Sequence, residues 1–172
     1  IGAIDSTKIT AIETADMAAI ASDQVVGFTT AQIAALTTDQ VKAMTTGQVQ
    51  SLTAKQVAAL TTAGVVALET GDFAKLTTAQ IAGMTTAQVA AIATDDLAAI
   101  TTAQMEGFTS AQIGALTTDQ VVAISTAQIK ALSTRQISGF TTDQLVTMET
   151  ADLAAITSAQ VGGFTTGQLS KL

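Results

Sequence analysis

The chain contains no cysteine, histidine, tryptophan, tyrosine, proline or asparagine. The absence of cysteine excludes disulfides and thiolate chemistry, and it leaves the redox compartment undetermined. Without histidine and cysteine, the usual pairs of a nucleophile and its base and the usual zinc sites are excluded as well. We therefore expect no catalytic, cofactor-binding or metal-binding residues, and we do not expect the chain to be an enzyme.

Basic residues are also scarce. Seven Lys and Arg stand against 14 Asp and Glu, which gives a net charge of −7. A nucleic acid or an anionic membrane would need a basic face, so neither is an expected partner. No apolar run approaches the roughly 20 residues of a membrane span. No signal peptide is visible, because the repeat described next already includes Ile1.

An eight-residue repeat fills the whole chain. Two consecutive copies read Phe-Thr-Thr-Ala-Gln-Ile-Ala-Ala at residues 28–35 and Leu-Thr-Thr-Asp-Gln-Val-Lys-Ala at residues 36–43, and we number the slots one to eight from the Phe or Leu. Slots one and six are apolar in every copy, and slots four and seven vary. Slot three is Ser or Thr in 20 of 21 copies, slot five is Gln in 15 of 21, and slot eight is Ala or Gly in 18 of 22. This patterning distinguishes the chain from a disordered low-complexity tract.

The spacing of the large apolar residues predicts secondary structure. They are separated by five and three residues in turn, whereas a β-strand needs a spacing of two, so a β-solenoid fits badly. On a continuous helix the apolar stripe would drift by about 80° per repeat. We therefore expect the chain to break in every repeat, with one short helix over roughly slots three to eight.

A capping box supplies the break. In the copy that begins at Leu36, Thr37 is the expected N-cap and Gln40 returns a hydrogen bond to its backbone N–H, while Leu36 packs on Val41 as a hydrophobic staple. Because slot three keeps its hydroxyl more strictly than slot two, the cap at slot three stays open as an alternative.

Four copies vary in two slots together. Where slot five becomes Asp, slot two is never Thr but Glu or Ala, which indicates a contact between the two slots. In these copies we expect the cap to move to slot three, with the acids near the helix start favoured by the helix dipole. The paired residues of slots two and five are Glu13 and Asp16, Glu69 and Asp72, Ala93 and Asp96, and Glu149 and Asp152.

Slot eight indicates how neighbouring helices approach one another. Ala or Gly there lets short helices cross closely, and each Phe in slot one follows a Gly, which we interpret as a large residue compensated by a small one. An aromatic ligand patch is the alternative interpretation of these residues. The pairs are Gly27 and Phe28, Gly107 and Phe108, Gly139 and Phe140, and Gly163 and Phe164.

Other features admit a chemical interpretation beside a structural one. Neighbouring acids such as Asp95 and Asp96, or Glu149 and Asp152, suggest acid–base work or Ca²⁺ binding, but capped and solvated helix starts explain them as well. The five Met residues all occupy core slots, where they fill gaps. The Thr pairs are compatible with an ordered hydroxyl array for ice or glycans, although capping already accounts for them.

One octad buries too little surface to fold alone, so neighbours must stack. We predict an all-α fold, an α-solenoid of very short helices, with residues 1–172 forming a single uninterrupted array of about 21 octapeptide repeats. We take two octads as one layer, which gives an array on the order of 100 Å long. The pair Gly27–Phe28 recurs at 107–108, which suggests a super-period of 80 residues. Neither end changes character, so we expect either an excerpt of a longer array or molecules that stack end to end.

The whole chain resembles the Thr-Thr-x-Gln-Ile/Val-x-Ala-Leu octapeptide arrays of very large secreted or surface proteins of Gram-negative bacteria, often labelled adhesin-like or haem-utilisation-like. Residues 37–44 and 85–92 carry the match. The resemblance implies an extracellular or cell-surface location and a structural or adhesive role. It offers no haem ligand, because the chain has no His.

We therefore expect a structural extracellular repeat protein that forms a stalk, a spacer or a self-associating filament, with self-association end to end or side by side. The alternative is a solenoid scaffold or adhesin that binds a protein or glycan partner. That alternative predicts biased residues in slots four and seven on neighbouring repeats, whereas the charges in those slots scatter along the chain.

Overall fold

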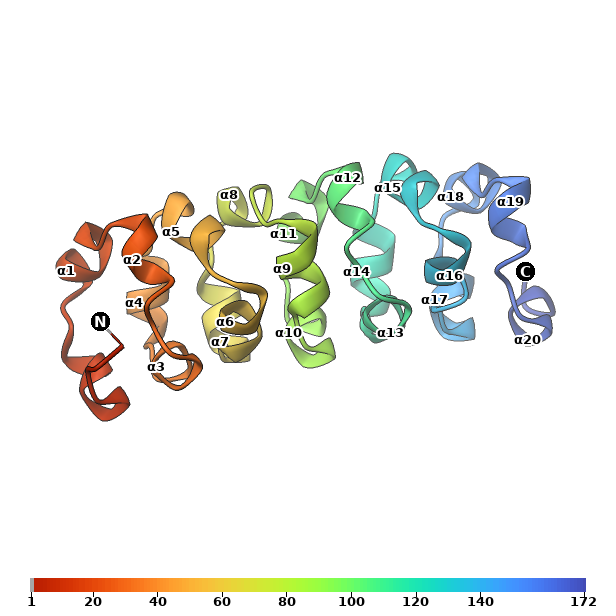
Figure 1. Ribbon diagram of the computed structural model, residues 1–172. Helices are drawn as coiled ribbons and strands as arrows, with labels where there is room; N and C mark the ends of the chain where they lie inside the picture. The colour runs from red at the N-terminus through yellow and green to blue at the C-terminus, as the bar shows by residue number, and fades with distance from the viewer. Residues whose placement is uncertain (1) are drawn as a thin grey trace.

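The computed structural model describes residues 2–172 as a rod of short helices, with no strand among them (Figure 1). The predicted all-α solenoid with one helix per octad is confirmed. Ile1, which we assigned to slot six, lies outside the described residues. The helices are η1 (Ser6–Ala11), α1 (Thr14–Ala19), α2 (Ser22–Val25), α3 (Thr30–Ala34), α4 (Thr38–Lys42), α5 (Thr46–Ser51), α6 (Ala54–Ala59), α7 (Thr62–Ala67), α8 (Thr70–Phe73), α9 (Thr78–Gly83), α10 (Thr86–Ala90), α11 (Thr94–Ala99), α12 (Thr102–Met105), α13 (Ser110–Ala115), α14 (Thr118–Ala123), α15 (Thr126–Ala131), α16 (Thr134–Ile137), α17 (Thr142–Thr147), α18 (Thr150–Ala155), α19 (Ser158–Val161) and α20 (Thr166–Leu169).

The capping box forms as predicted, and the cap lies at slot two. At the start of α4, the backbone N–H of Thr37 donates to Oε1 of Gln40 over 2.9 Å, and the backbone N–H of Gln40 donates to Oγ1 of Thr37 over 3.2 Å. Leu36 and Val41, the two residues of the staple, are both buried. The alternative of a cap at slot three is wrong for these octads.

The N-cap residue of every α-helix has extended backbone, and after several helices the residue before that cap is extended as well. After α5, Leu52 has φ −58° and ψ 139°, and Thr53 follows with φ −71° and ψ 158°. No residue between 2 and 172 has a positive φ. The break therefore requires no glycine and no strained residue, which is why the octad can repeat with ordinary amino acids.

The four octads with Asp in slot five correct one prediction. Their helices still begin at slot three, and slot two remains the N-cap without a side-chain capping bond. The cap therefore does not move to the Thr of slot three. Instead, Oδ1 of Asp96 accepts a hydrogen bond from Oγ1 of Thr70 on the preceding turn over 2.6 Å, and Thr126 and Asp152 form the same bond over 2.7 Å. At these two places a slot-three hydroxyl thus links two turns rather than capping its own helix.

The helices wind into a superhelix in which each helix packs on the one three positions later. Examples are α6 on α9, α8 on α11 and α15 on α18. The expectation of two octads per layer is therefore wrong, because one turn takes between three and four octads. With about 9 Å between packed layers, the rod is on the order of 55 Å long rather than 100 Å.

The apolar slots form one continuous core along the axis of the rod. Slot six and slot one are buried from Val25 and Phe28 through Leu145 and Met148. Slot five is buried as well wherever a preceding turn covers it, from Gln32 onward, whereas Lys8, Asp16 and Gln24 in the first turn are exposed. Slots two and four lie on the outside of the rod, as slot seven does in most repeats, so the exterior is rich in Thr and Ala.

Candidate functional site

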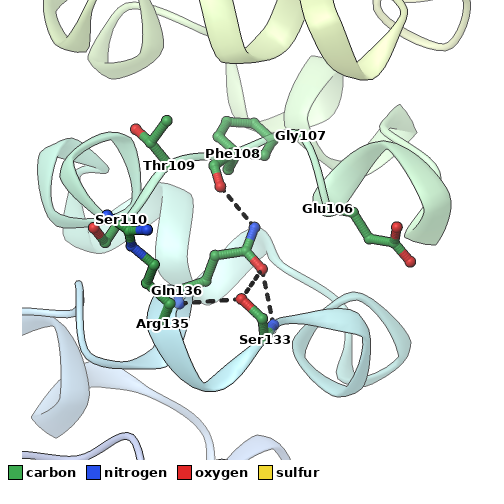
Figure 2. A pocket seen from close by; sticks show the side chains of 8 residues that line it. All are labelled: Glu106, Gly107, Phe108, Thr109, Ser110, Ser133, Arg135 and Gln136. Atoms are coloured by element: carbon green, nitrogen blue, oxygen red, sulfur yellow. Dashed lines mark hydrogen bonds between the residues drawn. The ribbon is translucent and has the colours of Figure 1, made fainter.

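The slot-five glutamines are the most regular polar feature between the turns. Gln136 illustrates them in Figure 2, where its Oε1 accepts from the backbone N–H and the hydroxyl of Ser133, each over 2.8 Å. Its Nε2 donates to the backbone carbonyls of Met105 and Phe108 on the preceding turn, each over 2.7 Å. One carboxamide therefore caps its own helix and ties that helix to the turn before it.

The same tie recurs along the rod. Gln40 donates to the carbonyls of Ile9 and Ile12, each over 2.7 Å, which lie 31 and 28 residues earlier. Within residues 2–172 no buried side-chain nitrogen or oxygen lacks a hydrogen-bond partner. From residue 32 onward, the buried slot-five glutamines therefore use their amides to hold the rod together.

A surface groove lies beside this tie. An open pocket of about 380 Å³ is lined on one turn by residues 106–110 and on the next by Ser133, Arg135 and Gln136. Figure 2 shows Arg135 extending toward Ser110, while Glu106 points away on the opposite side. In terms of slots, one wall runs from slot seven through slot three, and the other contains slots two, four and five.

The groove is a property of the repeat rather than of one location. A second open pocket, of about 540 Å³, is lined by residues 10–14 on one wall and by Thr37, Asp39 and Gln40 on the other. These residues occupy the same slots as those of the first pocket. The variable slots four and seven therefore face each other across a groove between successive turns, where they can diversify the surface without disturbing the core.

Slot eight forms the floor of the contact between turns. A Cβ on Gly107 would lie 2.7 Å from the carbonyl oxygen of Thr78, and a Cβ on Gly139 would lie 2.3 Å from that of Ser110. Glycine is required at these positions because backbone meets backbone. The accompanying Phe108 and Phe140 are only 3% exposed and Phe28 is also buried, so the interpretation as an aromatic ligand patch is wrong for these three. Phe164 is half-buried.

The residues considered for acid–base or metal chemistry are spread along the rod. Asp96 and Asp152 are buried and each accepts a hydrogen bond from a threonine. Among the described residues, no group of three or more His, Cys, Asp or Glu is placed to hold a metal ion. All five Met residues lie in the core, at positions 17, 44, 84, 105 and 148.

The last described turn has a different character. An apolar pocket of about 250 Å³ is lined by slot-one and slot-six residues of this turn. In the earlier turns from Val25 to Met148 the residues of these slots are buried, because the turn that follows covers them. Its lining residues are Leu153, Ile156, Val161, Phe164, Leu169 and Leu172. No helix in residues 2–172 is long and apolar enough to cross a membrane.

The sequence did not predict the cross-turn bonds of the glutamines. A capping box accepts Glu as readily as Gln at this position, yet slot five is Gln in 15 of 21 octads and never Glu. That preference was the available signal, because only the amide brings protons to donate to carbonyls.

Comparison with protein families identifies the repeat. The model of the ALTTAQ repeat matches residues 9–46, 41–70, 65–95, 89–126 and 121–148 in succession. The chain belongs to the ALTTAQ repeat family. The five matches overlap and run through most of the rod, so the ALTTAQ pattern describes the octad and its tandem arrangement. No curated protein matches the chain.

Proposed function

We propose that this ALTTAQ array is the structural body of an extracellular bacterial surface protein, where it serves as a stalk or spacer. The observation that carries the proposal is the repeated carboxamide tie, such as Gln112 Nε2 to the carbonyls of Ile81 and Met84, each over 2.7 Å. Each tie joins one turn to the turn before it, so the array behaves as one continuous rod. The extracellular location rests on the resemblance to surface arrays.

A spacer of this design has a length set by the number of octads. Each turn adds about 9 Å along the axis, so each octad adds between about 2 and 3 Å. The groove residues in slots four and seven vary freely without altering this length, because they lie outside the core. Such a rod separates whatever is joined to its two ends by a fixed distance.

The test compares the full array with a variant that lacks residues 76–131. This segment is seven complete octads, because it begins at a slot-one residue and ends at a slot-eight residue. We expect small-angle scattering to show a rod about 18 Å shorter, with unchanged helicity by circular dichroism. A deletion variant of unchanged length, or one that loses its helicity, would contradict a spacer built of equivalent turns. Antibody labelling of intact cells that express the parent protein would test the surface location.

A binding scaffold is the second candidate, and the recurrent groove favours it. Arg135 and Glu106 place opposite charges on the two walls of one groove. A protein or glycan partner would then be captured by the natural array and bound less well after Arg135→Ala. The matched control is Lys55→Ala, which changes a basic slot-four residue on another turn. Equal binding by both variants and the parent would remove this groove from consideration.

Self-association is the third element of the proposal. The two faces that meet between turns are complementary to each other, because slot-five amides on one face meet the slot-six and slot-one carbonyls of the other. Two arrays in contact through such faces would continue the rod. Sedimentation velocity across a hundredfold range of concentration tests this, and a single monomeric species throughout would contradict it.

A further inference from the structure

The carboxamide ties are interrupted at four places. From residue 32 onward, slot five holds Gln except at Gly64, Asp72, Asp96 and Asp152. Glycine has no side chain, and an ionised carboxylate accepts hydrogen bonds but has no proton to donate. Neither residue can therefore supply the two N–H bonds that Gln gives to the preceding turn.

Asp96 and Asp152 keep a side-chain link to the preceding turn in another form. Each accepts a hydrogen bond from a threonine hydroxyl on that turn, over 2.6 Å from Thr70 and 2.7 Å from Thr126. The junctions at α11 and α18 thus exchange an amide tie for a hydroxyl tie. They are altered but still bonded.

Gly64 and Asp72 differ because their side-chain and capping bonds are local and their octads are consecutive. The backbone N–H of Gly64 donates to Oγ1 of Thr61 over 3.0 Å, and Oδ2 of Asp72 accepts from the backbone N–H of Glu69 over 3.0 Å. The other ties span 31 and 28 residues. A glutamine at position 64 would therefore reach the carbonyls of residues 33 and 36, and one at position 72 would reach those of residues 41 and 44. The helices α7 and α8 therefore pack on α4 and α5 without a carboxamide tie.

The octads on either side are tied normally. Gln56 donates to the carbonyls of Val25 and Phe28 over 3.1 and 2.8 Å. Gln80 donates to those of Val49 and Leu52 over 2.9 and 2.8 Å. The interruption at α7 and α8 is thus confined to about half a turn of the rod.

We propose that the junction of α7 and α8 with α4 and α5 is a built-in opening point, at which the rod separates first when it is heated or stretched. In a solenoid each turn is held only by its neighbours, so stability is a sum of local junction terms. Opening then begins at the junction with the fewest bonds. This inference concerns the folded array alone, so its failure would leave the spacer proposal untouched.

Amide hydrogen exchange tests the proposal because an equivalent segment serves as an internal reference. Val65 and Leu68 donate their N–H groups within α7 and its cap, and Val121 and Ile124 do so in α14, where the Gln tie is present. We expect exchange of residues 62–74 to be at least about tenfold faster than that of residues 118–130. Equal rates in the two segments would overturn the proposal.

A repair variant identifies the cause of the faster exchange. Gly64→Gln completes a capping box with Thr61. The nearest neighbours of a Cβ at residue 64 are Oγ1 of Thr61 at 3.3 Å, Cγ2 of Val41 at 3.6 Å and Cδ2 of Leu60 at 3.7 Å. We expect exchange of residues 62–74 to slow by at least about tenfold, toward the rate of residues 118–130.

Two matched variants separate the amide tie from other effects. Gly64→Ala removes the flexibility of glycine without adding an amide, and Gly71→Gln adds the same side chain where a Cβ meets no atom within 4 Å. Both should slow exchange far less than Gly64→Gln. If Gly64→Ala slows exchange as much, glycine flexibility and not the missing tie governs opening, and the proposal is wrong. The reciprocal change Gln120→Gly should create fast exchange at residues 118–124, and its absence would also overturn the proposal.

Discussion

Replacing Gln112 with Met removes one complete tie while keeping the length of the side chain. Gln112 is 2% exposed. Its Nε2 donates to the carbonyls of Ile81 and Met84, each over 2.7 Å, and its Oε1 accepts from the backbone N–H of Thr109 over 2.7 Å. Methionine fills much of the same volume but makes none of these bonds.

The expected loss follows from the three bonds. Each intramolecular hydrogen bond contributes about 0.5–1.5 kcal/mol net, and a buried acceptor left without a donor adds to the cost. The free energy of unfolding should therefore fall by about 2–4 kcal/mol, a large part of the roughly 5–15 kcal/mol that holds a typical protein folded. The loss should be concentrated at the junction of α13 with α10, because solenoid junctions act locally.

Urea titration followed by circular dichroism measures the change, with Gln24→Met as the matched control. Gln24 lies in the first turn and is exposed, and its Oε1 accepts from the backbone N–H of Ala21 over 3.2 Å. This control loses a cap but no tie to a preceding turn. If the two variants lower the free energy of unfolding equally, within about 0.5 kcal/mol, the cross-turn tie contributes nothing beyond the cap and the reasoning is refuted.

Three further predictions concern other contacts of the rod. Gly139→Ala should destabilise the protein by about 2 kcal/mol, because its Cβ would lie 2.3 Å from the carbonyl oxygen of Ser110. The control Gly71→Ala, whose Cβ would meet no atom within 4 Å, should be neutral or slightly stabilising. Thermal unfolding compares the two variants, and equal melting temperatures would contradict the close approach. Thr126→Val should lower the free energy of unfolding by about 1 kcal/mol through loss of the bond to Asp152. Thr118→Val should lower it less, because the residue at the equivalent separation from Thr118 is Gln144 and not Asp. A double-mutant cycle of Thr126→Val with Asp152→Asn that shows no coupling would refute the link. The backbone N–H of Thr7 and then its hydroxyl lower the pKa of Asp5 below the ordinary 3.8; because the folded pKa is depressed, the stabilisation is present above about pH 3.8 and is lost as pH falls through the folded value. An NMR titration of Asp5 should show this low midpoint, and Thr7→Ala should raise it toward the ordinary value.

The helix of each octad was predictable because its signals are local. Thr37, Gln40, Leu36 and Val41 lie within six residues, so the box and the staple specify where each helix begins. The small residues of slot eight also indicated a close approach, and Gly107 against Thr78 is that approach. The partner helix was not predictable, because every octad offers nearly the same surface to every other.

The number of octads per turn could not be predicted for the same reason, and the expected two octads differ from the observed three to four. It depends on how Gln40 reaches carbonyls 28 and 31 residues away, and no pattern within one octad contains that distance. The role of Thr70 was missed likewise: its hydroxyl bonds Asp96 on the next turn rather than its own helix. Contacts between identical units are fixed by three-dimensional packing that a repeated sequence does not encode position by position.

Each helix packs on the one three positions later, and the ties of Gln40 span 28 and 31 residues, so one turn takes about three and a half octads. A position therefore recurs on the same side of the rod only after about two turns, or seven octads. Figure 1 shows this recurrence, with α6, α13 and α20 along the lower edge and α5, α12 and α19 along the upper edge. The chain already uses the interval, because Asp16 and Asp72, and Gly83 and Gly139, are each separated by seven octads. A substitution repeated in every octad would spiral around the rod, whereas one repeated in every seventh octad would draw a straight line along one side. Groups attached at every seventh octad would therefore lie in a row on one side of the rod, at intervals of about 18 Å.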